Sequence, residues 1–170
     1  MAVLLNPPSA SSGMRSRNAV ERAATLLGYD EVVIANLCAA ATPSVAELNS
    51  FDQDAWAASR AQLNVSMQDA AGLLAGWGVA GLSGDARRWL QAQVEWLIGT
   101  AESCGIGAFW TVGGEPRHPS RWHQYVSDKY GRTSGGSFEE RLKQVLIEVP
   151  TECWVTTARH SRSIQVSSSR

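Results

Sequence analysis

The chain has 170 residues and a formal net charge of -1, with 44% hydrophobic and 18% charged residues. A chain of this size and composition buries roughly 70% of its unfolded surface within one domain, which excludes a mostly disordered protein. The near-neutral charge excludes a protein that coats nucleic acid through bulk positive charge, because such domains are strongly basic, but it permits a local basic site.

Short apolar runs alternate with helical patterns along the chain. Continuous apolar residues predict buried strands at residues 2–5, 32–35, 72–75 and 107–112. Apolar residues spaced three and four apart predict helices at residues 15–27, from Asp52 to about residue 70, from Ser83 or Asp85 to about residue 100, and from Ser137 to about residue 148. Capping-box patterns begin at Ser44 and Ser137.

This alternation is typical of βαβ units and predicts an α/β fold with three α/β/α layers around a central, mainly parallel four-stranded sheet. We expect residues 1–150 to form this single domain and residues 151–170 to form a partly flexible C-terminal extension. Ligands of such sheets bind beyond the carboxyl ends of the strands. The unusual loops, at residues 6–8, from 36 onward, 76–78 and 117–120, all follow predicted strands, so the sequence predicts one site made of four loops.

The three cysteines, Cys38, Cys104 and Cys153, are odd in number and widely spaced, which favours reduced thiols over a disulfide framework. The first residues predict neither a signal peptide nor a membrane anchor. We therefore expect a cytoplasmic protein that does not bind a membrane. The sequence indicates no oligomeric state.

The strand ends offer three candidate kinds of site: a nucleotide site, a metal or nucleophile site, and a site of neutral polar groups. Residues 76–81 match G-x-G-x-x-G, but the acidic partner of a dinucleotide site is missing, so a tight turn is favoured and a small-nucleotide site here is a remote alternative. Neither a zinc motif nor a G-x-S-x-G elbow is present, and we expect no metal and no cofactor. Neutral polar groups remain: Asn6, Asn36, His118 and Ser120. Such groups suit the cleavage of an N-glycosidic bond, which mainly requires stabilisation of the departing base.

Four short motifs carry a resemblance. Residues 5–13, Leu-Asn-Pro-Pro-Ser-Ala-Ser-Ser-Gly, resemble the first motif of the uracil-DNA glycosylase superfamily, especially its mismatch-specific branch. His118-Pro119-Ser120 resembles the second motif, residues 33–37 resemble the strand that ends in a base-binding Asn, and residues 73–78 resemble a Leu-Leu-Trp-Gly strand end. The chain is also similar to a bacterial and phage domain-of-unknown-function family that opens with Leu-Asn-Pro-Ser.

The resemblance implies a uracil-DNA-glycosylase-like fold and a role for each matched residue. Asn6 would orient the water, with Pro7 and Pro8 fixing its loop, and His118 would stabilise the leaving base. The base site would be completed by Asn36 and Gly78. DNA would be contacted by Ser120, Arg117, Arg121, Trp122, Lys129 and Arg132, with Trp122 as a possible wedge or, alternatively, a core residue.

The chain also departs from the superfamily pattern. Leu5 and Pro8 stand where glycines are usual, and Asn6 replaces the Asp of the fastest branch, which implies slow hydrolysis or none. Two hypotheses for the function therefore remain. The first is an N-glycosidase that acts on an extruded pyrimidine, whether ordinary, modified or mismatched, in single- or double-stranded DNA or in a nucleotide. The second is a DNA- or modified-base-binding module that does not cut.

Overall fold

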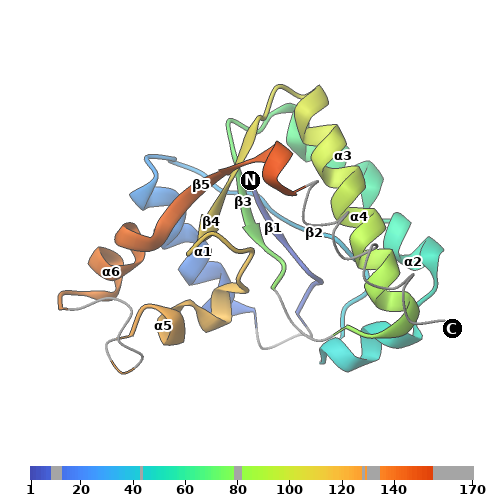
Figure 1. The fold of residues 1–170 in the computed structure, drawn as a ribbon, viewed down its shortest axis with the longest axis horizontal. Helices are drawn as coiled ribbons and strands as arrows, with labels where there is room; N and C mark the ends of the chain where they lie inside the picture. The colour runs from blue at the N-terminus through green and yellow to red at the C-terminus, as the bar shows by residue number, and fades with distance from the viewer. Residues whose placement is uncertain (9–12, 43, 79–81, 128, 130–134, 155–170) are drawn as a thin grey trace, which may run out of the picture.

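The computed structural model describes residues 1–8, 13–42, 44–78, 82–127, 129 and 135–154. Its centre is a sheet with the strand order β2-β1-β3-β4-β5 (Figure 1). The strands are β1 (Ala2–Leu4), β2 (Ile34–Asn36), β3 (Leu73–Gly76), β4 (Ala108–Val112) and β5 (Leu146–Pro150). The first four run parallel, and β5 pairs antiparallel with β4. The predicted α/β class is confirmed, with one strand more than the four expected.

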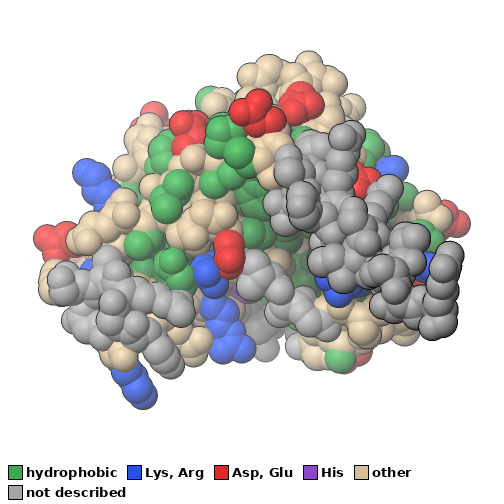
Figure 2. Space-filling model, in the orientation of Figure 1, with side chains coloured by type: hydrophobic (Ala, Val, Ile, Leu, Met, Phe, Trp, Pro, Cys, Tyr) green, Lys and Arg blue, Asp and Glu red, His purple; other side chains and the backbone are tan. Residues whose placement is uncertain are grey.

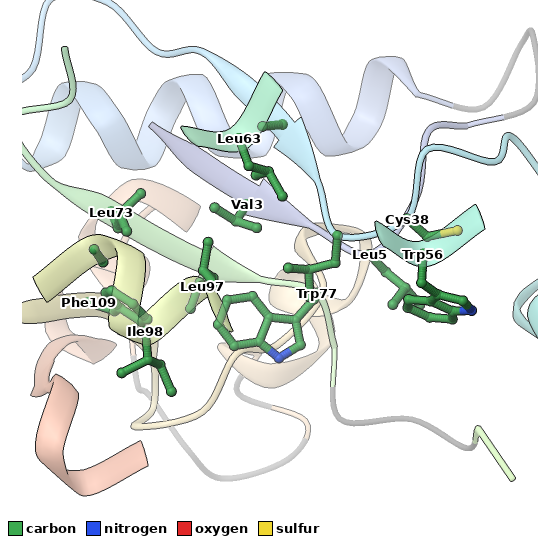
Figure 3. Close-up of a cluster of buried hydrophobic side chains, with 14 of the residues drawn as sticks. Val3, Leu5, Cys38, Trp56, Leu63, Leu73, Trp77, Leu97, Ile98 and Phe109 are labelled. Carbon is green, nitrogen blue, oxygen red and sulfur yellow. The ribbon is translucent and has the colours of Figure 1, made fainter. Parts of the chain in front are cut away.

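Helices cover both faces of this sheet (Figure 1). They are α1 (Met14–Leu26), η1 (Val45–Ser50), α2 (Gln53–Ala57), α3 (Arg60–Gln68), α4 (Gly84–Ser103), η2 (Pro119–Arg121), α5 (Trp122–Tyr125) and α6 (Phe138–Val145). One buried cluster joins α2, α3 and α4 to the sheet and includes Trp56, Leu63, Leu97 and Phe109 (Figure 3). A second joins α1, α5 and α6 to the other face. Burial on both sides explains why the strands are continuous apolar runs.

The segment after α6 differs from the prediction. The helix that we expected to continue to about residue 148 ends at Val145, and the next residues form β5. The capping box at Ser137 is confirmed, so the start of this helix was predicted correctly. Ile147 and Val149 are β-branched, which suits an extended edge strand, and Pro150 ends that strand where its missing N–H costs no ladder bond.

The helix predicted from Asp52 to about residue 70 is divided into α2 and α3. Asp52 caps α2 as expected, because its carboxylate accepts a hydrogen bond from the Ala55 N–H at 3.0 Å. At the break, the Ser59 hydroxyl lies 2.8 Å from the Leu37 carbonyl and 3.2 Å from the Trp56 carbonyl. Such local side-chain bonds compete with a continuous helix. Ser44, the other expected cap, precedes η1 without a capping side-chain bond.

The packed part of the chain runs past the predicted domain boundary at Pro150. The Thr151 N–H and hydroxyl both donate to the Gly107 carbonyl, at 2.9 and 3.2 Å. The Trp154 ring lies 5.4 Å from that of Trp77 and 5.8 Å from that of Phe109. The rest of the predicted extension, residues 155–170, lies outside the described residues. Within the described part of the chain, no helix is long and apolar enough to span a membrane.

Candidate functional site

A pocket of about 420 Å³ lies at the carboxyl ends of β1 and β2. Five of the predicted site residues line it, namely Asn6, Pro8, Asn36, His118 and Ser120. They come from the end of β2 and from the loops after β1 and β4, which meet because parallel strands end at the same edge of the sheet. The expected convergence of the two asparagines and the histidine is therefore a feature of the fold.

Asn6 is held by its amide nitrogen. Nδ2 donates to the Pro7 carbonyl at 3.0 Å, to Thr42 Oγ1 at 3.2 Å and to the Thr42 carbonyl at 3.5 Å. Thr42 lies in the loop after β2, and a parallel bridge between Pro8 and Thr42 joins the two loops. Pro7 acts here through its carbonyl and is not a lining residue. The amide N–H groups are thus used within the protein.

Asn36 is the last residue of β2 and pairs with Leu4 of β1 in the parallel register. Its Oδ1 atom is buried and has no hydrogen-bond partner among the described residues. The backbone of the next residue, Leu37, is held by α4. The buried Gln93 side chain donates through Nε2 to the Leu37 carbonyl at 2.9 Å. The backbone just after the strand end is therefore held by α4, whereas Asn36 Oδ1 has unused hydrogen-bonding capacity among the described residues.

His118 begins η2, where it acts as the N-cap. The backbone N–H of Ser120 donates to His118 Nδ1 at 3.3 Å, and the Ser120 hydroxyl lies 2.8 Å from the same atom. A backbone N–H can only donate, so Nδ1 carries no proton and the neutral ring carries its proton on Nε2. Burial, and then the charge of Arg121, lower the pKa of His118, which keeps the ring neutral at neutral pH.

Two glycines of β3 and its following loop make room for the His118 segment. A Cβ on Gly76 would lie 2.8 Å from Leu4 Cδ2 and 3.3 Å from Pro119 Cδ. Gly78 has a φ of +88°, and its Cβ would lie 3.5 Å from that of His118. Gly78, predicted to bind the base, thus supports His118 and is not among the described lining residues. The other residues of the G-x-G-x-x-G pattern, 79–81, lie outside the described part of the chain.

Two residues expected to contact DNA are used inside the protein. Trp122 is fully buried in the second core cluster, and its Nε1 donates to the Arg117 carbonyl at 2.6 Å. Of the two predicted alternatives, Trp122 is a core residue and not a wedge. A wedge needs an exposed side chain, whereas Trp122 is buried in a cluster that includes residues of α1. The Arg117 guanidinium pairs with Glu115 at 2.7 Å and stacks 4.2 Å from the Tyr125 ring centroid. These contacts stabilise the loop that carries His118.

The remaining predicted cations vary in placement. Arg121 and Lys129 are exposed, whereas Arg132 lies outside the described residues. On the face shown in Figure 2, Lys and Arg side chains are scattered and form no broad basic patch over the visible described surface. Any electrostatic contribution from this face is therefore local, as the composition predicted.

Several lining residues were missed by the sequence analysis, above all Thr42, Ser16 and Arg17. The last two belong to the first turn of α1, which borders the pocket. No local pattern marks them, although a helix that begins directly after the Asn6 loop must start near that loop. Leu5 is buried in the first core cluster, so its side chain does not narrow the pocket (Figure 3). Among the described residues, no group of three His, Cys, Asp or Glu side chains could hold a metal ion.

Comparison with known proteins gives one relationship. Neither the curated proteins nor the solved structures contain a match. A family model described as "Protein of unknown function (DUF1643)" matches residues 1–120, which include β1 to β4 and every described residue that lines the pocket. The matched segment ends at Ser120, so it stops where the described pocket does and leaves out α5, α6 and β5. The chain belongs to the DUF1643 family.

Proposed function

We propose that the protein is a DNA glycosylase-like N-glycosidase. It would bind a pyrimidine base extruded from DNA, whether ordinary, modified or mismatched, and hydrolyse the bond between the base and the sugar. The observation that carries this proposal is the convergence of Asn6, Asn36 and His118 on one pocket. All three are polar and neutral, which suits a reaction that needs stabilisation of a leaving group more than a strong nucleophile.

In this reaction the bond between C1′ and the base nitrogen breaks with its electron pair on the base, and a water oxygen bonds to C1′. One proton of that water leaves to the solvent. The Nε2–H of the neutral His118 can donate a hydrogen bond to a carbonyl oxygen of the departing base, where negative charge develops. Because Nδ1 is occupied by the Ser120 N–H, the ring presents this donor without a change of tautomer.

The charge pattern of the pocket supports an anionic leaving group. Arg17 is the charged side chain among the described lining residues, and no carboxylate lines that part of the pocket. Glycosidases that use two carboxylates as acid and base need a different set of groups. A departing base anion, in contrast, gains from a nearby cation, and the exposed Arg17 divides its charge between the pocket and its ion pair with Glu21 at 3.4 Å. The volume lies at the low end of the ~300 to 1,000 Å³ typical of small-molecule sites, which suits one base with its sugar.

Base release tests the proposal directly. The purified chain is incubated with oligonucleotides that contain uracil, mismatched thymine or modified pyrimidines, and abasic sites are detected by alkaline strand cleavage. We expect at least one substrate to be cut. His118→Ala should lower the rate about 100- to 1,000-fold, the effect of losing one donor to a developing anion. His123→Ala, a matched change at an exposed histidine outside the described pocket lining, should leave the rate unchanged.

One observation favours the alternative of a binding module. Pro8 lines the pocket where related loops have glycine, and a Cβ on Gly13 would lie 2.6 Å from Pro8 Cγ, so the pocket wall is tightly packed there. The same oligonucleotides in a binding assay separate the two functions. Specific binding that survives Asn6→Ala and His118→Ala, without turnover on any substrate, would establish a binding module and refute the glycosidase.

A further inference from the structure

We infer that Thr42 is a positioning residue that fixes the orientation of the Asn6 amide, so that Asn6 offers only a hydrogen-bond acceptor to a ligand. The identity of that ligand rests on the proposed function, whereas the orientation of the amide does not. Thr42 is 6% exposed and lies in the loop after β2, 36 residues from Asn6.

The orientation follows from a chain of hydrogen bonds that begins at a backbone carbonyl. The Ser44 carbonyl can only accept, so the Thr42 hydroxyl, 3.0 Å away, must donate its single proton to it. Once that proton is used, Thr42 Oγ1 can only accept. The Asn6 group 3.2 Å from Oγ1 must therefore be the NH₂ end of the amide.

The other neighbours of this amide end agree. Nδ2 also lies 3.0 Å from the Pro7 carbonyl and 3.5 Å from the Thr42 carbonyl, and both of these groups are acceptors. The reversed amide would place Oδ1 against two carbonyl oxygens and lose the bond to Thr42. An unpaired buried polar group loses its solvation without a compensating hydrogen bond, so the reversed amide is strongly disfavoured.

Asn6 Oδ1 is consequently the atom left for a ligand, since no described residue donates a hydrogen bond to it. An amide oxygen can orient water or accept from an N–H of a base, but it cannot donate to a base carbonyl. His118 has the opposite polarity, because a backbone N–H fixes its proton on Nε2. A ligand of this pocket must therefore present a hydrogen-bond donor to Asn6 Oδ1 and an acceptor to His118 Nε2. The Ser44 carbonyl sets the first requirement and the Ser120 N–H sets the second.

Hydrogen exchange of the Asn6 side chain tests the orientation without any substrate. In ¹⁵N-labelled protein, the Asn6 NH₂ signals are identified by their loss in Asn6→Ala. We expect them to exchange at least tenfold more slowly than the NH₂ protons of exposed Asn64 in the native chain and in Thr42→Ser, which keeps the hydroxyl. Thr42→Val keeps the shape and removes the hydroxyl, so protection should fall about tenfold. Unchanged protection in Thr42→Val would overturn the inference.

Turnover gives the second measurement, on whichever oligonucleotide the native chain cuts. Thr42→Val should lower kcat about 10- to 100-fold with little change in KM, because a misplaced water affects the chemical step more than binding. Thr42→Ser should stay within about threefold of the native kcat. Thr100→Val, on α4, removes a hydroxyl that bonds only the helix carbonyl of Trp96 and serves as the matched control.

The two proposals fail in different ways. If Thr42→Val behaves like Thr100→Val, or if Thr42→Ser loses as much activity as Thr42→Val, Thr42 does not position Asn6. If the native chain cuts no substrate, the proposed function fails, and the exchange measurement still decides the role of Thr42.

Discussion

The loops that follow β1 and β3 leave the sheet side by side, because Leu4 pairs with Gly76 in the parallel register. After β1, Asn6 lines the pocket with a polar side chain held by neighbouring loops. After β3, Trp77 is buried beside Phe109 (Figure 3), with the ring centroids 6.5 Å apart. The Trp154 ring centroid lies 5.4 Å from that of Trp77. Counted from the Leu4–Gly76 pair, Trp77 is level with Leu5, and both are buried in the first core cluster. One position further on, Asn6 is level with Gly78, so the β1 loop has a polar side chain where the β3 loop has none.

The difference shows what the glycines after β3 do. Gly76 has no side chain where Leu4 and Pro119 come close, and Gly78 gives the loop a φ of +88°, which side chains rarely adopt, so the β3 loop contributes space and a turn to the site. The β1 loop instead contributes chemistry. A glycine pattern that resembles a nucleotide-binding loop is explained at Gly76 by the close approach of Leu4 and Pro119, and at Gly78 by a positive φ.

Asn6→Asp changes the polar side chain of the β1 loop and is expected to have the largest effect. The new carboxylate would face the Pro7 and Thr42 carbonyls in place of the NH₂ group, so its pKa should rise above the usual value. A raised pKa destabilises the fold once the group is charged, so stability should fall as pH rises through that pKa, by about 1–3 kcal/mol. Base release should fall about 100-fold. Urea unfolding from pH 4 to pH 8 and the cleavage assay measure both effects.

Asn64→Asp, on the exposed surface of α3, is the control for the added charge and should not reproduce this pH dependence. Faster base release by Asn6→Asp, with stability independent of pH, would mean that the Thr42 hydroxyl turns away from Ser44 to donate to the carboxylate. The orientation of residue 6 would then not be fixed by its neighbours.

Gly76→Ala tests the β3 side. The added Cβ would meet Leu4 and Pro119, and crowding of this kind costs about 1–3 kcal/mol. It should also displace the His118 ring and shift its NMR signals. Gly99→Ala, on α4, has no neighbour within 4 Å and should instead stabilise the chain by up to about 1 kcal/mol, since alanine is the better helix former. Equal urea midpoints for the two variants would show that the β3 loop does not support the site.

The parts of the fold that depend on local pattern could be predicted from the sequence. The apolar runs predicted β1 to β4, and the polar residues at the end of β2 and in the loops after β1 and β4 predicted Asn36, Asn6 and His118. β5 was not predicted because it follows α6 directly, without a turn residue. Its burial does not alternate regularly either, since Leu146 and Val149 are partly buried and the two residues between them are exposed.

The parts that depend on distant contacts could not be predicted. Thr42 follows a run of alanines, and its role depends on a partner 36 residues away. Trp122 was weighed as a wedge or a core residue, and the choice depends on how α5 packs against the sheet and α1, which no local spacing indicates. Arg117 could be identified as a cation, but its ion pair with Glu115 and its stacking on Tyr125 arise only when the His118 loop folds.

Arg121→Gln is expected to have the smallest effect and tests what keeps the His118 ring neutral. Burial is the larger cause of the lowered His118 pKa and the charge of Arg121 the smaller, so removing that charge should raise the pKa slightly while it stays below its usual value. Because the unfolded chain binds a proton at His118 more readily than the folded chain does, stability falls as pH drops from the unfolded pKa toward the folded one. The variant should narrow the pH range between these two pKa values. Titration of the His118 Cε1–H signal, identified by its loss in His118→Ala, measures the shift, with Arg87→Gln as the control for charge. A pKa that does not move would mean that the surrounding protein alone keeps the ring neutral, so that the β3 glycines and Ser120, and not the exposed cation, set the state of His118.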